Sequence, residues 1–317
     1  MDQGLRTLVV GVGGVGGYFG GRLALAGEAV AFVARGATLA ALRDGGLRIV
    51  DRAGTSHLER VHVVSDPADV GPRDLVLVCV KSYDTEAVAA ALRPVVRPGT
   101  IVLSLQNGIE NEALLAAALG LPPLLGGLTH IGAEQVAPGV IRHDSGGRIV
   151  FGELDGRVSE RCERVAALFR RAGVAHHLSR HIAILMWDKL AWNAAFNAVT
   201  TVTRRSVGAV LARPDGRATV RAAMLEVVAV ANAAGVALDA GRVDPEIERS
   251  AKELGHLRTS MLQDRERGGR LEHEALNGAV LRAAERSAVA LPVNRVLYGL
   301  LSTLDERRQP SRPSSGQ

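Results

Sequence analysis

The stretch TLVVGVGGVG, residues 7–16, decides the fold. A short apolar run, typical of a buried strand, leads directly into spaced glycines and then into a helix-like segment over residues 15–26. The first glycine of the G-x-G-x-x-G pattern allows a tight turn, the second lets the backbone approach a pyrophosphate, and the third allows close packing of helix on strand. The pyrophosphate would lie against the free N–H groups at the start of that helix. The stretch therefore predicts a dinucleotide-binding loop whose members are Gly11, Gly13, Gly14, Val15 and Gly16.

Strand-like and helix-like segments alternate as far as residue 179. Strand-like runs lie at 8–12, 29–34, 75–80, 101–105, 124–128, 149–151 and 174–178, and several of them are near-continuously apolar. Alanine-rich, helix-like stretches such as 86–92 and 110–118 lie between them. Apolar runs of this kind are typical of parallel strands that are buried on both faces. We therefore predict an α/β domain over residues 1–180, a doubly wound sheet of the Rossmann type that binds a dinucleotide.

The strand-like runs stop after residue 182, and the rest of the chain has helical patterns. The predicted helices cover 182–200, 217–235, 245–267 and 271–289, with turns at 213–216 and 268–269. We predict an all-α C-terminal domain over residues 181–304 that carries the substrate and the catalytic groups. The polar, proline-punctuated segment 305–317 is predicted to be a disordered tail.

Composition and charge argue against several classes of protein. The sequence pI is about 9.7, but the net charge is only +5 and aromatic residues are 3% of the chain, too few for the stacking surfaces of a nucleic-acid binder. Two cysteines, Cys79 and Cys162, are too few for a disulfide framework or a metal cluster. No apolar run reaches the roughly 18 residues of a membrane helix, and the N-terminus lacks a secretion signal. We expect a cytoplasmic protein whose basic surface suits small anions, with no metal, nucleic-acid or membrane partner.

Arg35 lies at the end of the second strand-like run, nineteen residues beyond Gly16. NAD-specific folds carry a carboxylate about 20 residues beyond the loop, where it binds the ribose hydroxyls. No carboxylate occurs from Ala29 to Leu42. A guanidinium can bind a 2′-phosphate with two hydrogen bonds, whereas an acid would repel it. The sequence therefore favours NADPH over NADH.

Two further polar residues follow strand-like runs, and the carboxyl ends of parallel strands form the ligand-binding edge of such sheets. Lys81 follows LVLVCV at 75–80, and Asn107 follows IVLSL at 101–105 within Gln-Asn-Gly. We predict that both lie at the cofactor site. A surface lysine and a plain Asn-Gly turn are the alternatives.

The segment LMWDKLAWNAAFNAV, residues 185–199, carries three polar residues spaced by four. Lys189, Asn193 and Asn197 would form one narrow stripe on a helix whose other positions, apart from Asp188, are apolar. A buried amine and buried amides need partners, because unpaired buried polar groups cost about 1–3 kcal/mol each. Either the three groups bind one another and the backbone, or they line a cleft and bind a ligand. The adjacent dinucleotide-binding domain favours a ligand.

Glu272 is a further polar residue on the apolar face of a predicted helix. On a helical wheel of residues 271–289 it falls in the middle of the apolar face, whereas Glu274 falls nearly opposite. A carboxylate directed at a core is rarely left unpaired. Glu272 is therefore predicted to pair with a buried lysine or with a ligand, and a structural ion pair is the alternative.

Together these motifs resemble one family, the ketopantoate reductases (2-dehydropantoate 2-reductases). The resemblance runs in order over residues 6–300 and comprises GVGGVG (11–16), Arg35, VK (80–81), QNG (106–108), WDKLAWNAAFN (187–197), TSMLQD (259–264) and the Glu272-x-x-x-x-Asn277-Gly278 spacing. The resemblance implies hydride transfer from NADPH to the 2-oxo group of ketopantoate, which gives pantoate for pantothenate biosynthesis. It implies that Lys189 is the catalytic acid and Glu272 its acidic helper. It also implies substrate-binding roles for Asn193, Asn197 and Ser260, with Lys81 and Asn107 contacting the cofactor or the bound substrate.

The sequence departs from the family pattern near the predicted substrate site. Asn197 is followed by alanine where the family often has proline, and residues 205–208 lack an expected asparagine. Reduction of another small 2-oxo acid is therefore an alternative. A β-hydroxyacid dehydrogenase is a second alternative, although GGLTHIGAEQVAPG (126–139) does not resemble that family's D-x-P-V-S-G-G-like segment. A third is a non-catalytic NADPH sensor, which would have no use for the polar stripe. The buried helical faces could serve the other domain or a partner subunit, so a homodimer is also possible.

Overall fold

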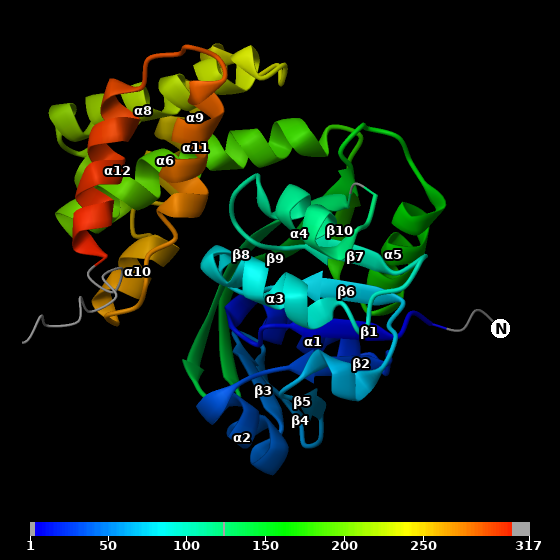
Figure 1. Ribbon diagram of the computed structural model, residues 1–317. Helices are drawn as coiled ribbons and strands as arrows, with labels where there is room; N and C mark the ends of the chain where they lie inside the picture. The colour runs from blue at the N-terminus through cyan, green and yellow to red at the C-terminus, as the bar shows by residue number, and fades with distance from the viewer. Residues whose placement is uncertain (1–3, 123, 306–317) are drawn as a thin grey trace, which may run out of the picture. The chain divides into compact units, whose positions relative to one another are not determined.

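The structure is a computed structural model that describes residues 4–122 and 124–305 (Figure 1). The chain divides into two compact units, residues 1–183 and residues 184–317. The first unit contains a ten-stranded sheet with helices, and the second consists of helices and the segments that join them. The predicted class, a Rossmann-type α/β domain followed by an all-α domain, is therefore confirmed.

The sheet of the first unit has the strand order β4-β3-β9-β8-β7-β6-β1-β2-β5, and β10 pairs with β9. The strands are β1 (Thr7–Val10), β2 (Val30–Val33), β3 (Leu47–Asp51), β4 (Gly54–Leu58), β5 (His62–Val64), β6 (Leu75–Val78), β7 (Ile101–Ser104), β8 (Leu125–Ala137), β9 (Val140–Glu153) and β10 (Ala175–Leu178). From β5 to β7 all neighbours are parallel. The doubly wound part is thus the half of the sheet that carries the glycine loop.

The other half of the sheet differs from the prediction. β8 and β9 form an antiparallel hairpin of 13 and 14 residues, whereas the sequence indicated only short runs at 124–128 and 149–151. β3, β4 and β5 were not predicted. β5 has only three residues. In the β3–β4 hairpin, polar and partly exposed positions interrupt the apolar ones, so no continuous apolar run marks these strands. Patterns this short and this polar cannot be separated from loops by periodicity alone.

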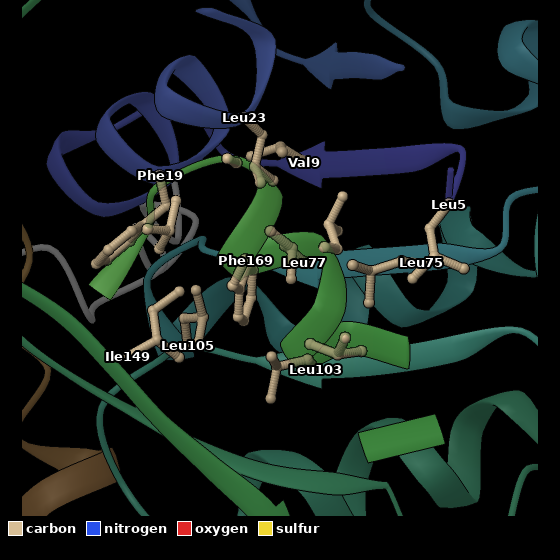
Figure 2. Packing of buried hydrophobic residues seen from close by; sticks show 14 of the residues in the cluster. Leu5, Val9, Phe19, Leu23, Leu75, Leu77, Leu103, Leu105, Ile149 and Phe169 are labelled. Atoms are coloured by element: carbon tan, nitrogen blue, oxygen red, sulfur yellow. The ribbon is translucent and has the colours of Figure 1, made fainter. Parts of the chain in front are cut away.

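The central strands are buried on both faces, as their continuous apolar sequence requires. Along β1, Leu8 and Val10 belong to one core cluster and Val9 to the other. Helices α1 (Gly14–Leu25) and α5 (Glu160–Arg171) contribute to the Val9 cluster, where Phe19 and Phe169 are fully buried (Figure 2). Helices α3 (Thr85–Leu92) and α4 (Asn111–Leu119) contribute to the opposite cluster. Each such buried side chain stabilises the unit by about 1.5–3 kcal/mol.

The second unit is built from α6 to α12. Its elements are α6 (Ile182–Thr203), which begins at the end of the first unit, α7 (Val207–Leu211), α8 (Pro214–Ala233), η3 (Ala240–Arg242), α9 (Val243–Glu253), α10 (Ser260–Glu266), the π-helical turn η4 (Glu274–Gly278), α11 (Ala279–Glu285) and α12 (Pro292–Leu304). The helix predicted over 245–267 is in fact two helices. Gly255 lies in the break, and its carbonyl oxygen accepts a hydrogen bond from the Gly208 N–H of α7 at 2.9 Å. The turn predicted at 213–216 is instead the start of α8, with proline in its first turn.

The end of the chain was predicted as a disordered tail from residue 305. Asp305 is only 4% exposed, and its Oδ2 lies 3.6 Å from Nδ1 of the buried His273. Residues 306–317 lie outside the described residues. Within the described part of the chain, no helix is long and apolar enough to cross a bilayer, and no cluster of three His, Cys, Asp or Glu side chains could hold a metal ion.

Candidate active site

The glycine loop has the backbone geometry that a dinucleotide site needs. Gly11 adopts φ +94°, and a Cβ there would lie 2.8 Å from the Val80 side chain. A Cβ on Gly16 would collide with the carbonyl oxygen of Gly11, so this glycine allows the helix to pack against the loop. Gly13 has no atom within 4 Å of its Cβ position. The second glycine therefore faces open space, as expected where a ligand approaches the backbone.

Helix α1 begins directly after this open position, with Gly13 as its N-cap and no acidic residue in its first turn. A cavity of about 200 Å³ adjoins the loop. Its lining includes Gly11, Gly13, Arg35, Thr38 and Gln135. Free N–H groups, a positive helix end and an open cavity together fit an anionic dinucleotide.

Arg35 is exposed at the end of β2, where it is the N-cap of α2 (Gly36–Gly45). The cavity lining also contains a carboxylate, Asp84, but this residue ends the short 3-10 helix η2 (Ser82–Asp84) that follows β6. It does not occupy the β2 end, where NAD-binding folds carry their acid. The arrangement leaves a guanidinium at the position that would meet the adenosine ribose.

The cavity residues Gln135 and Thr38 were not predicted, and Gln135 comes from the long β8 strand. The Gln135 side chain donates to the carbonyl oxygen of Val12 at 3.2 Å and to the Thr38 hydroxyl at 3.1 Å. A Cβ on Gly14 would collide with the carbonyl oxygen of Ala133, so β8 lies directly against the glycine loop. Gln135 is 123 residues from Val12 in sequence, and no local pattern marks this contact.

The structure brings the segments of Lys81 and Asn107 together. β6 and β7 are parallel neighbours with Val78 opposite Ser104, so their carboxyl ends meet at one edge. The Ser82 hydroxyl donates to the carbonyl oxygen of Asn107 at 2.8 Å. Lys81 and Asn107 are both half-buried. Both residues therefore lie at the edge formed by the carboxyl ends of β6 and β7.

In the second unit, α6 presents the predicted polar stripe. Lys189 is half-buried, whereas Asn193 and Asn197 are 7% and 1% exposed. The Asn197 amide donates to Asn193 Oδ1 at 3.2 Å, and its oxygen accepts from the Met261 N–H at 3.2 Å. The two asparagines thus bind each other, and Asn197 also binds the start of α10.

Ser260 is the first residue of α10 and is exposed, whereas its neighbour Thr259 is buried. The hydroxyls of Thr259 and Thr200 lie 2.7 Å apart. This contact joins α10 to α6 beside the stripe. An exposed serine therefore lies next to buried groups that fix the position of its backbone.

Lys189 and Glu272 interact electrostatically. Burial lowers the pKa of Lys189 from its usual 10.5 to about 8, and the charge of Glu272 opposes this shift. An amine with this pKa is still mostly protonated at neutral pH and can release its proton readily. Such a group is suited to general acid catalysis.

Glu272 is 6% exposed and Glu274 is half-buried, which is the order that the helical wheel predicts. The reason differs from the prediction, because the helix begins only at Glu274 and does so as a π-helical turn. Asn277 of this turn, fully buried, donates to the carbonyl oxygen of Ala194 in α6 at 2.9 Å. π-Helical turns are rare and often occur at functional sites. Here the turn is bound to the helix that carries Lys189.

A Rossmann-type glycine loop followed by a helical domain with a titratable lysine defines the class of dinucleotide-dependent oxidoreductases. Comparison with known proteins supplies the family. The model of the family described as ketopantoate reductase PanE/ApbA matches residues 7–156, and the model of its C-terminal domain matches residues 182–305. The chain belongs to the ketopantoate reductase family.

Individual relatives cover nearly the whole chain. A 2-dehydropantoate 2-reductase of Halobacterium salinarum is 36% identical over 94% of this chain and 98% of its own. The crystal structure of a 2-dehydropantoate 2-reductase from Geobacter metallireducens has a TM-score of 0.88 at 36% identity, covering 94% of this chain and 99% of that one. A D-mandelate dehydrogenase solved with NADH and anilino(oxo)acetate has the same TM-score at 21% identity, covering 95% and 98%. This last likeness shows the fold alone.

Proposed function

We propose that this protein reduces ketopantoate to pantoate with NADPH, as in pantothenate biosynthesis. Relatives that carry the name 2-dehydropantoate 2-reductase support the substrate. The observation that carries the proposal is the half-buried Lys189, with a pKa near 8 and the charge of Glu272 acting on it. A non-catalytic NADPH sensor would gain nothing from such a proton donor.

The first unit holds NADPH in this proposal. The open face of Gly13 and the start of α1 receive the pyrophosphate, and Arg35 binds the 2′-phosphate. The bound cofactor supplies a hydride. Lys81 and Asn107 orient the cofactor and the substrate from the carboxyl ends of β6 and β7.

The second unit supplies the proton and binds the substrate. As C2 of the 2-oxo acid accepts the hydride, negative charge develops on the carbonyl oxygen, and Lys189 donates a proton from Nζ to that oxygen. Glu272 keeps Lys189 protonated until then. Asn193 and Ser260 bind the carboxylate and hydroxyl of the substrate. Asn197, whose amide already binds Asn193 and Met261, acts by orienting Asn193.

A second candidate function is the reduction of another small 2-oxo acid. Residues 205–208 lack the asparagine that the family resemblance implies. The uncharged polar side chain of this segment, Ser206, caps α7 by accepting from the Ala209 N–H at 3.4 Å. A serine engaged in this way is less available to a substrate hydroxyl. The predicted domain roles, the cytoplasmic location and the homodimer remain predictions from the sequence.

An assay of NADPH oxidation with a panel of 2-oxo acids tests the proposal. We expect ketopantoate to give a higher kcat/KM than pyruvate or 2-oxobutyrate, because its hydroxyl can pair with a buried polar group that an alkyl chain leaves unpaired. A higher kcat/KM for 2-oxobutyrate would establish the second candidate instead. No oxidation with any 2-oxo acid would reject both.

A further inference from the structure

A buried polar cluster lies where β6 and β7 end, and the mechanism above does not use it. Thr85, Gln106 and Asn111 are 1%, 5% and 3% exposed. Thr85 is the first residue of α3 and Asn111 the first residue of α4. The two helices follow the segments that carry Lys81 and Asn107, so the cluster adjoins both segments.

The hydrogen bonds of this cluster form a closed ring. The carbonyl oxygen of Asn107 accepts from Ser82 Oγ and from Asn111 Nδ2, both at 2.8 Å. The Thr85 hydroxyl lies 2.9 Å from Asn111 Oδ1 and 2.8 Å from the carbonyl oxygen of Ser82. The ring therefore runs from Ser82 through Asn107, Asn111 and Thr85 back to Ser82.

Thr85 is the hub of this ring. Its hydroxyl can donate to either oxygen, and it accepts from Gln106 Nε2 at 2.9 Å. Gln106 precedes Asn107 in sequence and Asn111 follows it. Thr85 therefore binds the Asn107 segment both before and after Asn107. The N-cap of α3 is Asp84 and makes no side-chain capping bond, so Thr85 is not the capping residue of this helix.

We propose that Thr85 is a positioning residue that holds the Lys81 and Asn107 segments at a fixed separation. The inference rests on the proposed function, because it acts through two residues that are proposed to contact NADPH and the 2-oxo acid. Loops at strand ends are ordinarily the mobile part of such a domain. A fully satisfied buried network makes the local structure rigid and unique. A fixed separation of the two segments orients the bound reactants, and small misplacements of reacting groups are costly.

The matched pair Thr85→Val and Thr7→Val separates positioning from plain stability. Both threonines are buried in the first unit. Thr7 begins β1, so it lies at the amino ends of the parallel strands and not at the carboxyl ends where Thr85 lies. Its hydroxyl donates to the Leu5 carbonyl oxygen at 3.1 Å. Valine keeps the volume and removes the hydroxyl. We expect Thr85→Val to lower kcat/KM by about 10- to 100-fold and to weaken NADPH binding, whereas Thr7→Val leaves both unchanged. Thr85→Ser, which restores a hydroxyl, should recover most of the activity.

A double-mutant cycle shows whether Thr85 acts through the proposed contact residue. The loss in Lys81→Ala/Thr85→Val should be smaller than the product of the two single losses, since Thr85 has less to position once Lys81 is gone. Equal kcat/KM and equal NADPH Kd for Thr85→Val and the parent would overturn the inference, and so would strictly multiplicative losses in the cycle. If Thr85→Val does not fold, Ser82→Ala, which opens the ring at another bond, takes its place with the same expectations.

The test remains decisive if the proposed function fails. A parent protein that reduces no 2-oxo acid rejects the function, and the NADPH Kd then decides the inference by itself. A Kd raised in Thr85→Val but not in Thr7→Val supports positioning of the cofactor. An unchanged Kd in both variants rejects it.

Discussion

The two units position their polar groups in different ways. In the first, the groups stand at the ends of parallel strands, and the charged ones are exposed or half-buried, as Arg35 and Lys81 show. In the second, they lie on one face of α6 and on the segment before a π-helical turn, where burial shifts the pKa of Lys189. An exposed guanidinium is suited to binding a phosphate, whereas an amine with a lowered pKa is suited to releasing a proton. The two units thus differ in the charged groups that they present, because Arg35 is exposed at a strand end whereas Lys189 lies on a helix where its pKa is lowered to about 8.

The largest effect is expected from the second unit. Lys189→Ala should lower kcat by roughly 10²–10⁴-fold, the range for removal of a positioned proton donor. Lys252→Ala is the matched control, because this lysine lies exposed on α9 of the same unit and should leave kcat unchanged. Steady-state rates with saturating NADPH and substrate provide the measurement. Comparable losses in both variants would show that the effect is not specific to the polar stripe.

A smaller effect is expected from the first unit. Arg35→Asp should lower the preference for NADPH over NADH, measured as the ratio of kcat/KM values, by about 30- to 1,000-fold, the equivalent of about 2–4 kcal/mol for a lost charge-assisted pair and an added repulsion. The exposed Arg43 at the other end of α2 offers a control, since Arg43→Asp should preserve the preference. Equal kcat/KM for the two cofactors in the parent would refute the role assigned to Arg35.

The pH dependence sharpens the contrast further. Lys189 must be protonated to act, and its pKa is lowered to about 8, so kcat/KM should be constant at acidic pH and fall as pH rises through about 8. Glu272 raises the pKa of Lys189, so in Glu272→Gln the fall in kcat/KM, the alkaline limb of the pH profile, should move to lower pH. Activity at pH 8 should then be reduced by several-fold. The exposed Glu253→Gln on α9 should leave the limb in place. A limb that stays in place in Glu272→Gln would mean that the two groups are not coupled.

The smallest effect concerns stability in the first unit. Glu112 is 3% exposed, burial raises its pKa from 4.5 to about 8, and its Oε2 has no hydrogen-bond partner among the described residues. Because the folded state holds the proton more tightly than the unfolded state, Glu112 favours folding most below pH 4.5, and this contribution is lost as pH rises toward 8.

Glu112→Gln keeps the shape and cannot ionise. The gain in melting temperature over the parent should therefore be near zero at pH 4 and grow to on the order of a few °C at pH 8. Thermal unfolding at several pH values measures it, with the exposed Glu86→Gln of α3 as the control. A gain that does not depend on pH would contradict the neutral state of Glu112.

Local sequence patterns predicted those features of the candidate site that lie within one short stretch of the chain. The glycine loop needs one strand, one turn and one helix, and the stripe from Lys189 to Asn197 needs only the four-residue spacing of one helix. Buried apolar runs likewise located β1, β2, β6 and β7. Each of these features is decided by residues that are close together in sequence.

Contacts between segments that are distant in sequence could not be predicted from local patterns. Thr85 meets Gln106 and Asn111 across 21 and 26 residues, and Gln135 reaches the glycine loop through a hairpin whose polar positions conceal its length. The Glu272 segment was predicted as regular helix because its apolar spacing is helical. In the structure a π-helical turn begins two residues later, at Glu274. Asn277 of this turn donates a buried hydrogen bond to the backbone of α6. Tertiary contacts override local propensity at such positions.

The most direct test of this division compares the two lysines that belong to the two parts of the proposed site. Saturating kcat and the Kd for NADPH are measured for Lys189→Ala and for Lys81→Ala. We expect Lys189→Ala to lose kcat while its NADPH Kd barely changes, and Lys81→Ala to weaken ground-state binding more than it lowers kcat. Near-normal kcat in Lys189→Ala together with abolished kcat in Lys81→Ala would refute the role of Lys189, because the proton donor would then belong to the first unit.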